Sequence, residues 1–345
     1  MRTKTLGVAV VAVVMAGLTA CSSGSTKTTS NPSASGGSTA IKSGLKIAIL
    51  PKQVNNPYFD AAYKGAQKAC NEIKTAKCEQ VGPTTATGAA QVQFINTIVQ
   101  QKYDALVVSA ADADSIAPAL HKAESAGLAV VTYDADVTDT TARAVMITPS
   151  SPDLIAKAQV KWISDAIGPD GGEVAILSAA ATAANQNAWI AIMKTELTAN
   201  YPKLKLVDTV YGNDDPATSA EKAAALMQSH PNLKGIIAPT TVGVREAAKY
   251  ISGSKYKGKV QVAGLGLPSE MRAYIKDGTV KTVGLWDPAM LGYVGVYAAA
   301  SKASGMDVSA GVTAGGKSYT VDDKGVLVVG PPAEFTKDTV DNFTF

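Results

Sequence analysis

The sequence predicts an α/β protein built from two Rossmann-like, doubly wound lobes. Short runs rich in β-branched residues alternate with longer stretches whose apolar residues recur at helical spacing. This alternation is typical of parallel sheets covered by helices on both faces. The series runs twice, once before about residue 147 and once after it. The roughly 300 residues involved also exceed the size at which a single hydrophobic core usually stops growing.

The expected elements follow one another in a regular order. The first half has expected strands at KIAIL (46–50), DALVVSA (104–110) and LAVVTYD (128–134), and the second half has EVAILSA (173–179), KLKLVDTV (203–210), GIIAP (235–239) and VQVAGL (260–265). Helical spacing is clearest in YFDAAYKGAQKACNEI (58–73) and TSAEKAAALMQSH (218–230). Neither half repeats the other in sequence, so the duplication is one of pattern only.

The N-terminus is typical of an exported protein. A positive start, MRTK, precedes the apolar run at 6–20, which is too short for a confident membrane span. We therefore expect residues 1–20 to be a signal peptide. Leu18-Thr19-Ala20 before Cys21 resembles a bacterial lipobox, so we expect Cys21 to be lipidated and to anchor the chain to the cell membrane, although a plain signal peptide with an incidental cysteine stays open. Residues 21–44 are rich in Ser, Thr, Gly and Pro and are expected to form a flexible tether.

Two further cysteines lie in ACNEIKTAKCEQV, at Cys70 and Cys78. Because an exported chain folds in an oxidising compartment, we expect them to form a disulfide. They straddle the end of one expected helix and the start of the next strand, which is a feasible geometry. Two free buried thiols are the alternative.

Composition and motifs exclude several classes of function. The net charge of +3 is made of scattered charges without a basic run, which argues against nucleic acid as a partner. No metal signature and no phosphate-binding GxxxxGK[ST] loop occurs, so no metal or cofactor is expected. His121 and His230 lie away from the strand ends, and no Ser/His/Asp arrangement is recognisable.

Ligands of open parallel sheets bind outside the carboxyl ends of the strands. The residues that stand at those ends are Pro51, Lys52, Asn56, Tyr58, Phe59, Asp112, Asp114, Asp134, Asp136, Asn185, Gln186, Asn187, Pro239, Thr240, Thr241, Gly266, Trp286 and Asp287. Each has a simpler alternative: a solvated lysine, an aspartate or amide that caps a turn or helix, an aromatic in the core. Carboxylates, amides, a lysine and aromatic rings together suit a small neutral polyol.

Several stretches resemble the sugar-binding lipoproteins of ABC importers, in the subgroup of rhamnose-binding and autoinducer-2-binding proteins. They include IAILPK, NNPYFDAAYKGAQKA, ALVVSAAD, VVTYDAD, TAANQNAWI, GLGLPSEMRAYIKDGTV and GLWDPAMLGYVGVYAA, and the likeness covers residues 45–345. The resemblance implies the periplasmic binding protein type I fold, in which two lobes joined by three crossovers close on one ligand. We expect an N-terminal lobe of 45–147 plus 287–323 and a C-terminal lobe of 148–286 plus 324–345.

The resemblance also implies specific ligand contacts. It assigns them to Lys52 of the LPK motif and to Asp134 of the YDAD motif. It also assigns them to Asn185, Gln186, Pro239 and Thr241. Wider ribose-binding relatives add Asn56, Phe59 and the hinge residue Trp286.

Two departures from the family pattern bear on the identity of the ligand. Autoinducer-2 receptors are expected to have an aspartate where this chain has Asn185, and ribose- and galactose-type relatives carry one where it has Gly266.

The predicted function is that of a monomeric, membrane-anchored substrate-binding component that delivers a monosaccharide to ABC permease subunits. A rhamnose-like deoxyhexose is favoured as the ligand, and autoinducer-2 is the alternative within the class. An extracytoplasmic sugar-acting enzyme stays open, with Asp134 and either Asp136 or Asp287 as its nominal carboxylate pair. A sensor ectodomain would require a transmembrane segment after the lobes, and none precedes Phe345.

Overall fold

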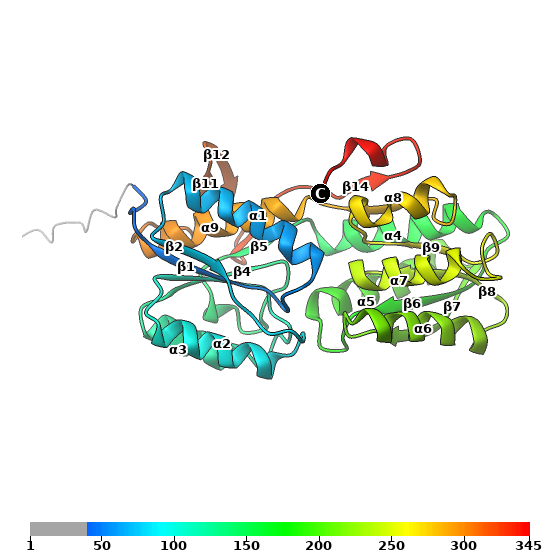
Figure 1. The fold of residues 1–345 in the computed structure, drawn as a ribbon, viewed down its shortest axis with the longest axis horizontal. Helices are drawn as coiled ribbons and strands as arrows, with labels where there is room; N and C mark the ends of the chain where they lie inside the picture. The colour runs from blue at the N-terminus through cyan, green and yellow to red at the C-terminus, as the bar shows by residue number, and fades with distance from the viewer. Residues whose placement is uncertain (1–39) are drawn as a thin grey trace, which may run out of the picture. The chain divides into compact units, whose positions relative to one another are not determined.

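The computed structural model describes residues 40–345, and these form two lobes, each built on its own parallel sheet. The N-terminal sheet has the order β13-β5-β4-β3-β1-β2, and its strands are β1 (Lys46–Leu50), β2 (Lys77–Gln80), β3 (Ala105–Val108), β4 (Ala129–Tyr133), β5 (Met146–Thr148) and β13 (Val326–Val328). Helices lie on both faces (Figure 1): α1 (Pro57–Glu72) and α9 (Pro288–Ala303) on one, and α2 (Gly88–Gln100) and α3 (Ala117–Ser125) on the other.

The strands of this sheet are buried on both sides, which explains their nearly continuous apolar sequences. In β1, Ile47 and Ile49 join the core beneath α1 and α9, whereas Ala48 and Leu50 join the core beneath α2 and α3. Alternate residues of a strand point to opposite faces, so a single strand contributes to two cores. The doubly wound α/β fold expected from the sequence is confirmed.

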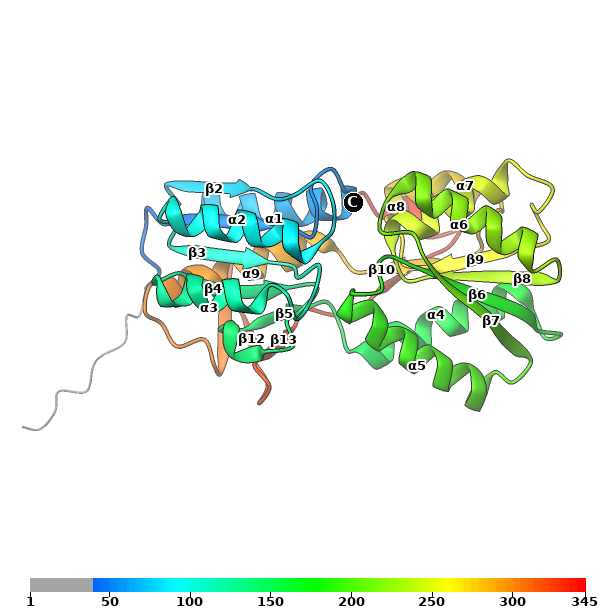
Figure 2. The same cartoon turned by 90° about the horizontal axis from the view of Figure 1, so that it is seen from below.

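The C-terminal sheet has the order β7-β6-β8-β9. Its strands are β6 (Gly172–Ser178), β7 (Leu204–Tyr211), β8 (Leu233–Ala238) and β9 (Gln261–Gly264). Figure 2 shows α4 (Pro152–Ile167) and α5 (Ala184–Asn200) on one face, and α6 (Pro216–Ser229) and α7 (Thr241–Ser252) on the other. The short helix α8 (Pro268–Lys276) packs beside α7.

Close packing of α1 against α9 depends on two glycines. A Cβ atom at Gly65 would lie 1.8 Å from the Ala289 carbonyl oxygen, and one at Gly292 would lie 1.9 Å from the Ala62 carbonyl oxygen. Real Cβ atoms never come so near to backbone, so any side chain at either position would force the helices apart. Because these two residues lack side chains, α9 can pack closely against α1 of the N-terminal lobe, although α9 follows the whole C-terminal sheet in sequence.

The described chain passes between the lobes three times: between β5 and α4, between β10 (Val283–Leu285) and α9, and between β13 and β14 (Ala333–Phe335). Because β13 pairs with β5 and β14 pairs antiparallel with β10, the last passage lies at 329–332. The sequence places the change of lobe at 323/324, whereas Val326–Val328 form β13 in the N-terminal sheet. A three-residue strand carries too little pattern to be assigned from sequence. The remaining elements are β11 (Gly311–Ala314), β12 (Lys317–Thr320), η1 (Thr140–Ala142) and η2 (Val340–Asn342).

Cys70, near the end of α1, and Cys78 in β2 form a disulfide with a Cα–Cα distance of 6.3 Å. The expected signal peptide, Cys21 and most of the expected tether lie outside the described residues. Within residues 40–345 no helix combines the length and apolar character needed to cross a membrane.

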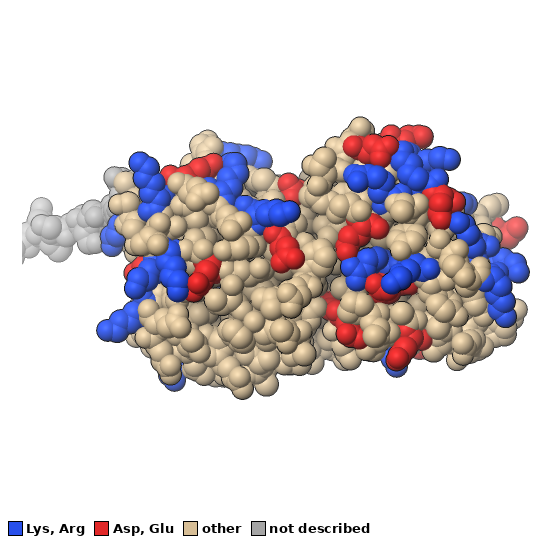
Figure 3. All heavy atoms as spheres, viewed as in Figure 1, with Lys and Arg blue, Asp and Glu red and all other residues tan. Residues whose placement is uncertain are grey.

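Figure 3 shows lysine and arginine side chains interspersed with aspartate and glutamate over one face of the molecule. The lower part of the N-terminal lobe in this view is largely uncharged, and α2, which lies there, contains no charged residue. This face therefore offers no continuous basic surface of the kind that binds nucleic acid.

Candidate functional site

A small cavity lies between the two lobes. All of the residues that the sequence predicts to contact a ligand line it: Lys52, Asn56, Phe59, Asp134, Asn185, Gln186, Pro239, Thr241 and Trp286. The remaining lining residues are Tyr58, Trp189, Asp214, Thr240, Leu265 and Leu285. The carboxyl ends of strands in both sheets meet here, as expected for open parallel sheets.

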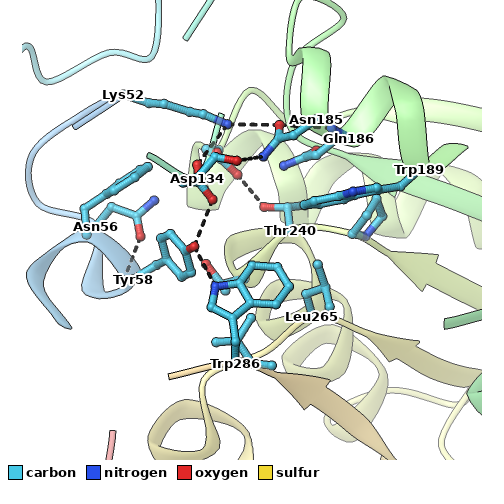
Figure 4. A pocket seen from close by; sticks show the side chains of 15 residues that line it. Lys52, Asn56, Tyr58, Asp134, Asn185, Gln186, Trp189, Thr240, Leu265 and Trp286 are labelled. Atoms are coloured by element: carbon cyan, nitrogen blue, oxygen red, sulfur yellow. Dashed lines mark hydrogen bonds and ion pairs between the residues drawn. The ribbon is translucent and has the colours of Figure 1, made fainter. Parts of the chain in front are cut away.

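Asp134 is the most tightly held charge in the cavity (Figure 4). It follows β4 in a left-handed backbone conformation, φ +63°, which is unusual for a residue other than glycine. Its Oδ1 accepts a hydrogen bond from the Tyr58 hydroxyl at 2.8 Å, and its Oδ2 accepts one from Ser109 at 2.8 Å. The Lys52 Nζ lies 3.5 Å from Oδ2, and the side chains of both partners are only 6% exposed. The carboxylate is thus oriented by contacts within the protein.

Hydrogen bonds join the two lobes at this cavity. The Lys52 Nζ donates to the Asn185 Oδ1 at 3.2 Å, and the Asn185 Nδ2 donates to the Asp134 carbonyl oxygen at 3.4 Å. Beside the cavity, the Gln53 Nε2 donates to the Asp214 carbonyl oxygen at 3.0 Å. These bonds connect the loops after β1 and β4 in one lobe with α5 and the loop after β7 in the other. The structure therefore holds the lobes together around the cavity.

Asn185 and Gln186 lie in the first turn of α5, but neither is its N-cap, because the N-cap residue is Ala183. The Gln186 Oε1 accepts hydrogen bonds from the Ser178 hydroxyl at 2.5 Å and from the Ala179 backbone N–H at 2.8 Å, both at the end of β6. An amide whose oxygen is engaged in this way has its NH₂ group left to donate. Gln186 is fixed to its own lobe by one end and lines the cavity.

Aromatic rings form one wall. Trp286, in the second passage between the lobes, donates from its Nε1 to the Tyr58 hydroxyl at 2.9 Å. Its ring meets those of Tyr58 and Trp189 edge to face, with centroids 6.3 Å and 6.1 Å apart, and Phe59 meets Tyr58 in the same way at 5.1 Å. Edge-to-face packing fixes ring orientation. The indole at the hinge is thereby connected through one hydroxyl to Asp134.

Asn56 has a structural role in addition to its position in the cavity. Its Oδ1 accepts a hydrogen bond from the Tyr58 backbone N–H at 3.0 Å, and it caps α1 ahead of Pro57. The capping alternative considered for polar residues at strand ends therefore applies to Asn56. Pro239 and Thr241 flank Thr240, the N-cap residue of α7.

Sequence reasoning overlooked Asp214, which follows β7 in the segment GNDDP at 212–216. The strand at 203–210 was expected, yet no residue at its carboxyl end entered the candidate set. The strand-end rule that selected Asp134 would also have selected Asp214. Burial raises the pKa of its carboxyl group, against smaller lowering effects of the hydrogen bond from Thr240 and of the Lys52 charge.

The site is suited to holding a small uncharged molecule. It combines one lysine, two buried carboxyl groups, three amides and aromatic walls. No cluster of His, Cys, Asp and Glu that could hold a metal ion occurs among residues 40–345. Donors and acceptors on both lobes converge on one cavity, as in sites that bind polyols.

Comparison with known proteins agrees with this description. Residues 47–307 match the family model described as periplasmic binding protein domain. Among curated proteins, the D-apiose import binding protein of Actinobacillus succinogenes is 25% identical over 258 residues, which is 70% of this chain and 78% of the relative.

Three solved structures are similar over most of the chain. A sugar ABC transporter protein of Actinomyces odontolyticus is 44% identical, with a TM-score of 0.69, and the match covers 88% of this chain and 100% of the other. A solute-binding protein of Clostridium phytofermentas with bound L-rhamnose is 33% identical, with a TM-score of 0.82 and coverage of 87% and 98%. LsrB of Clostridium saccharobutylicum in complex with AI-2 is 28% identical, with a TM-score of 0.82 and coverage of 87% and 100%. The chain therefore belongs to the periplasmic binding protein family, in its two-lobed type I form.

Proposed function

We propose that this protein is the substrate-binding component of an ABC importer and that it binds one monosaccharide in the cavity between its lobes. The observation that carries the proposal is the buried Lys52–Asp134 pair, which is oriented by one lobe and bonded to Asn185 of the other. A neutral sugar that bonds to both sides would favour the closed arrangement, and closure is the signal that a permease can recognise.

A 6-deoxyhexose such as L-rhamnose is the ligand that we favour. Leu265, Leu285 and Trp286 provide apolar surface against which a methyl group can pack. Where ribose- and galactose-type relatives are expected to carry an aspartate, Gly266 carries no side chain, and a Cβ there would lie 2.7 Å from the Met271 Cγ. The L-rhamnose-bound relative supports the same ligand class.

Autoinducer-2 is the second candidate, because a relative binds it and because Lys52, Asp134 and Gln186 offer the same chemistry to either ligand. The neutral Asn185, in place of the aspartate expected of autoinducer-2 receptors, is the feature that favours the deoxyhexose.

Neither of the nominal carboxylate pairs of an enzymatic role, Asp134 with Asp136 or with Asp287, forms in the cavity. Asp136, nominal partner of Asp134, pairs with Arg143 at 2.7 Å instead of facing the cavity, and Asp287 caps α9. The relatives are binding proteins of sugar transport systems rather than enzymes.

The remaining assignments are part of the same proposal. The binding protein acts outside the cytoplasm as a monomer, anchored through a lipid on Cys21, with the ABC permease as its partner. Labelling of cells with a palmitate analogue, with Cys21→Ser as the control, tests the anchor: loss of label and release of the variant into the medium are expected.

Ligand identity is tested by thermal shift and calorimetric titration against L-rhamnose, autoinducer-2, D-ribose and D-allose. A ligand at 100 times its Kd stabilises the folded protein by about 2.7 kcal/mol. We expect L-rhamnose to raise the melting temperature most. Asp134→Asn should lose most of this response, because the oriented carboxylate is removed. Absence of binding by any monosaccharide or by autoinducer-2 at millimolar concentration would refute the proposed function.

A further inference from the structure

Asp214 occupies a conformation that the chain adopts at some cost. It and the preceding Asn213 both have left-handed backbone angles, φ +50° and φ +55°, which residues with side chains rarely adopt. The conformation is fixed by bonds from several elements. The Asn213 N–H donates to the Ala179 carbonyl oxygen at 2.7 Å, and Gln53 of the N-terminal lobe donates to the Asp214 carbonyl oxygen at 3.0 Å. Strain held in this way is common at ligand-binding positions.

Asp214 is only 8% exposed and lines the cavity. The Thr240 hydroxyl donates to its Oδ1. Among residues 40–345, no other hydrogen bond or ion pair reaches this carboxyl group. The second carboxyl oxygen of this cavity-lining residue is therefore available to a ligand. A hydroxyl group of a bound ligand would satisfy that oxygen.

Asp214 also provides the charge that is otherwise missing from the C-terminal side of the cavity. Asn185, Gln186 and Thr240 are neutral, and the position after Leu265 is a glycine. The N-terminal side contributes both Lys52 and Asp134. A ligand placed between the lobes would therefore meet one carboxyl group from each side.

We propose that Asp214 is a specificity-determining ligand contact, whose free carboxyl oxygen accepts a hydrogen bond from one sugar hydroxyl on the C-terminal side of the cavity. This inference rests on the proposed function and extends it, since it predicts which hydroxyl groups the protein requires. A sugar that lacks the hydroxyl facing Asp214 would leave the oxygen unpaired and would bind weakly.

The decisive variant is Asp214→Asn. Asparagine tolerates the left-handed conformation, has the same shape and retains an oxygen for the Thr240 hydroxyl. The matched control is Asp215→Asn, in the same loop, because Asp215 does not line this cavity and asparagine replaces it well as the N-cap of α6. Asp214→Gly is the second variant, which relieves the backbone strain and removes the carboxyl group completely.

The probes are L-rhamnose and its analogues that each lack one hydroxyl group, titrated by calorimetry with a melting curve for every protein. We expect Asp214→Asn and Asp214→Gly to bind L-rhamnose at least tenfold more weakly than the wild type, and Asp215→Asn to remain within about twofold. Asp214→Asn should not melt lower than the wild type without sugar, because it keeps an acceptor for the Thr240 hydroxyl. One analogue should bind wild type and Asp214→Asn with similar affinity, because it lacks the hydroxyl that Asp214 contacts.

The outcomes separate this inference from the proposed function. If the wild type binds L-rhamnose and both Asp214 variants bind it with the same affinity, the role of Asp214 is overturned and the proposed function stays intact. Equal weakening of every analogue by Asp214→Asn would also overturn it, since no particular hydroxyl would then be read. A wild type that binds none of the sugars would overturn both.

Discussion

Replacement of Tyr58 by phenylalanine tests the network that joins the hinge to the ligand site. The Tyr58 hydroxyl donates to the Asp134 Oδ1 at 2.8 Å and accepts from the Trp286 Nε1 at 2.9 Å. Removal of the hydroxyl deletes a hydrogen bond to a charged group, worth roughly 1.5–3 kcal/mol, and leaves a buried indole N–H without that partner. We expect Tyr58→Phe to lower the free energy of unfolding by about 2–4 kcal/mol.

The control is Tyr133→Phe, a chemically identical change at a neighbouring site. Tyr133 is fully buried, yet its hydroxyl has no hydrogen-bond partner among the described residues. Because removal of an unpaired buried hydroxyl deletes no bond, its replacement should be neutral or slightly stabilising. Both variants therefore remove a hydroxyl group from a buried ring, but only the Tyr58 hydroxyl is hydrogen-bonded.

The assay is calorimetric melting of both variants with and without L-rhamnose. At about 2–4 °C per kcal/mol, Tyr58→Phe should melt at least 4 °C below the wild type, and Tyr133→Phe should not. The affinity of Tyr58→Phe should fall by about three- to tenfold, because Asp134 loses one of the groups that orient it. Its tryptophan emission should also shift, since Trp286 loses its partner. Equal melting temperatures and affinities for the two variants would refute the coupling.

Three further predictions concern other parts of the molecule. Asn185→Asp should weaken L-rhamnose binding and strengthen autoinducer-2 binding in paired titrations, whereas parallel loss of both would contradict the selectivity assigned to this position. Reduction of the Cys70–Cys78 disulfide should lower the free energy of unfolding by about 2–3 kcal/mol for a loop of this length, as measured by denaturant unfolding. Sugar affinity, measured by titration, should stay nearly unchanged. Two thiols that alkylate in the native, unreduced protein would show that the bridge is absent in solution. Gln53→Ala removes the hydrogen bond to the Asp214 carbonyl oxygen, and in stopped-flow experiments it should accelerate ligand release without slowing association. Small-angle scattering should show that the liganded variant is less compact than the liganded wild type. An unchanged release rate would exclude Gln53 from closure.

Much of the fold could be predicted because its signals are local. Strands buried on both faces must be apolar along their whole length, and the helices between them must carry an apolar stripe. The strand-end rule then identifies Lys52, Asp134 and Asn185 as neighbours of a ligand, because the chain direction alone determines which edge of a parallel sheet they occupy. The same rule would have found Asp214 if it had been applied to the strand at 203–210.

What only the tertiary structure decided is the pairing of groups that lie far apart in sequence. No local pattern connects Tyr58 with Trp286, 228 residues later, or Gln53 with the Asp214 carbonyl oxygen, 161 residues later. The tertiary structure also assigned the short β13 to the first lobe rather than the second. Local sequence determines how each segment folds, because backbone geometry and side-chain periodicity act over a few residues. The distance and orientation between two lobes depend on contacts summed over the whole chain, and these set which donor meets which acceptor.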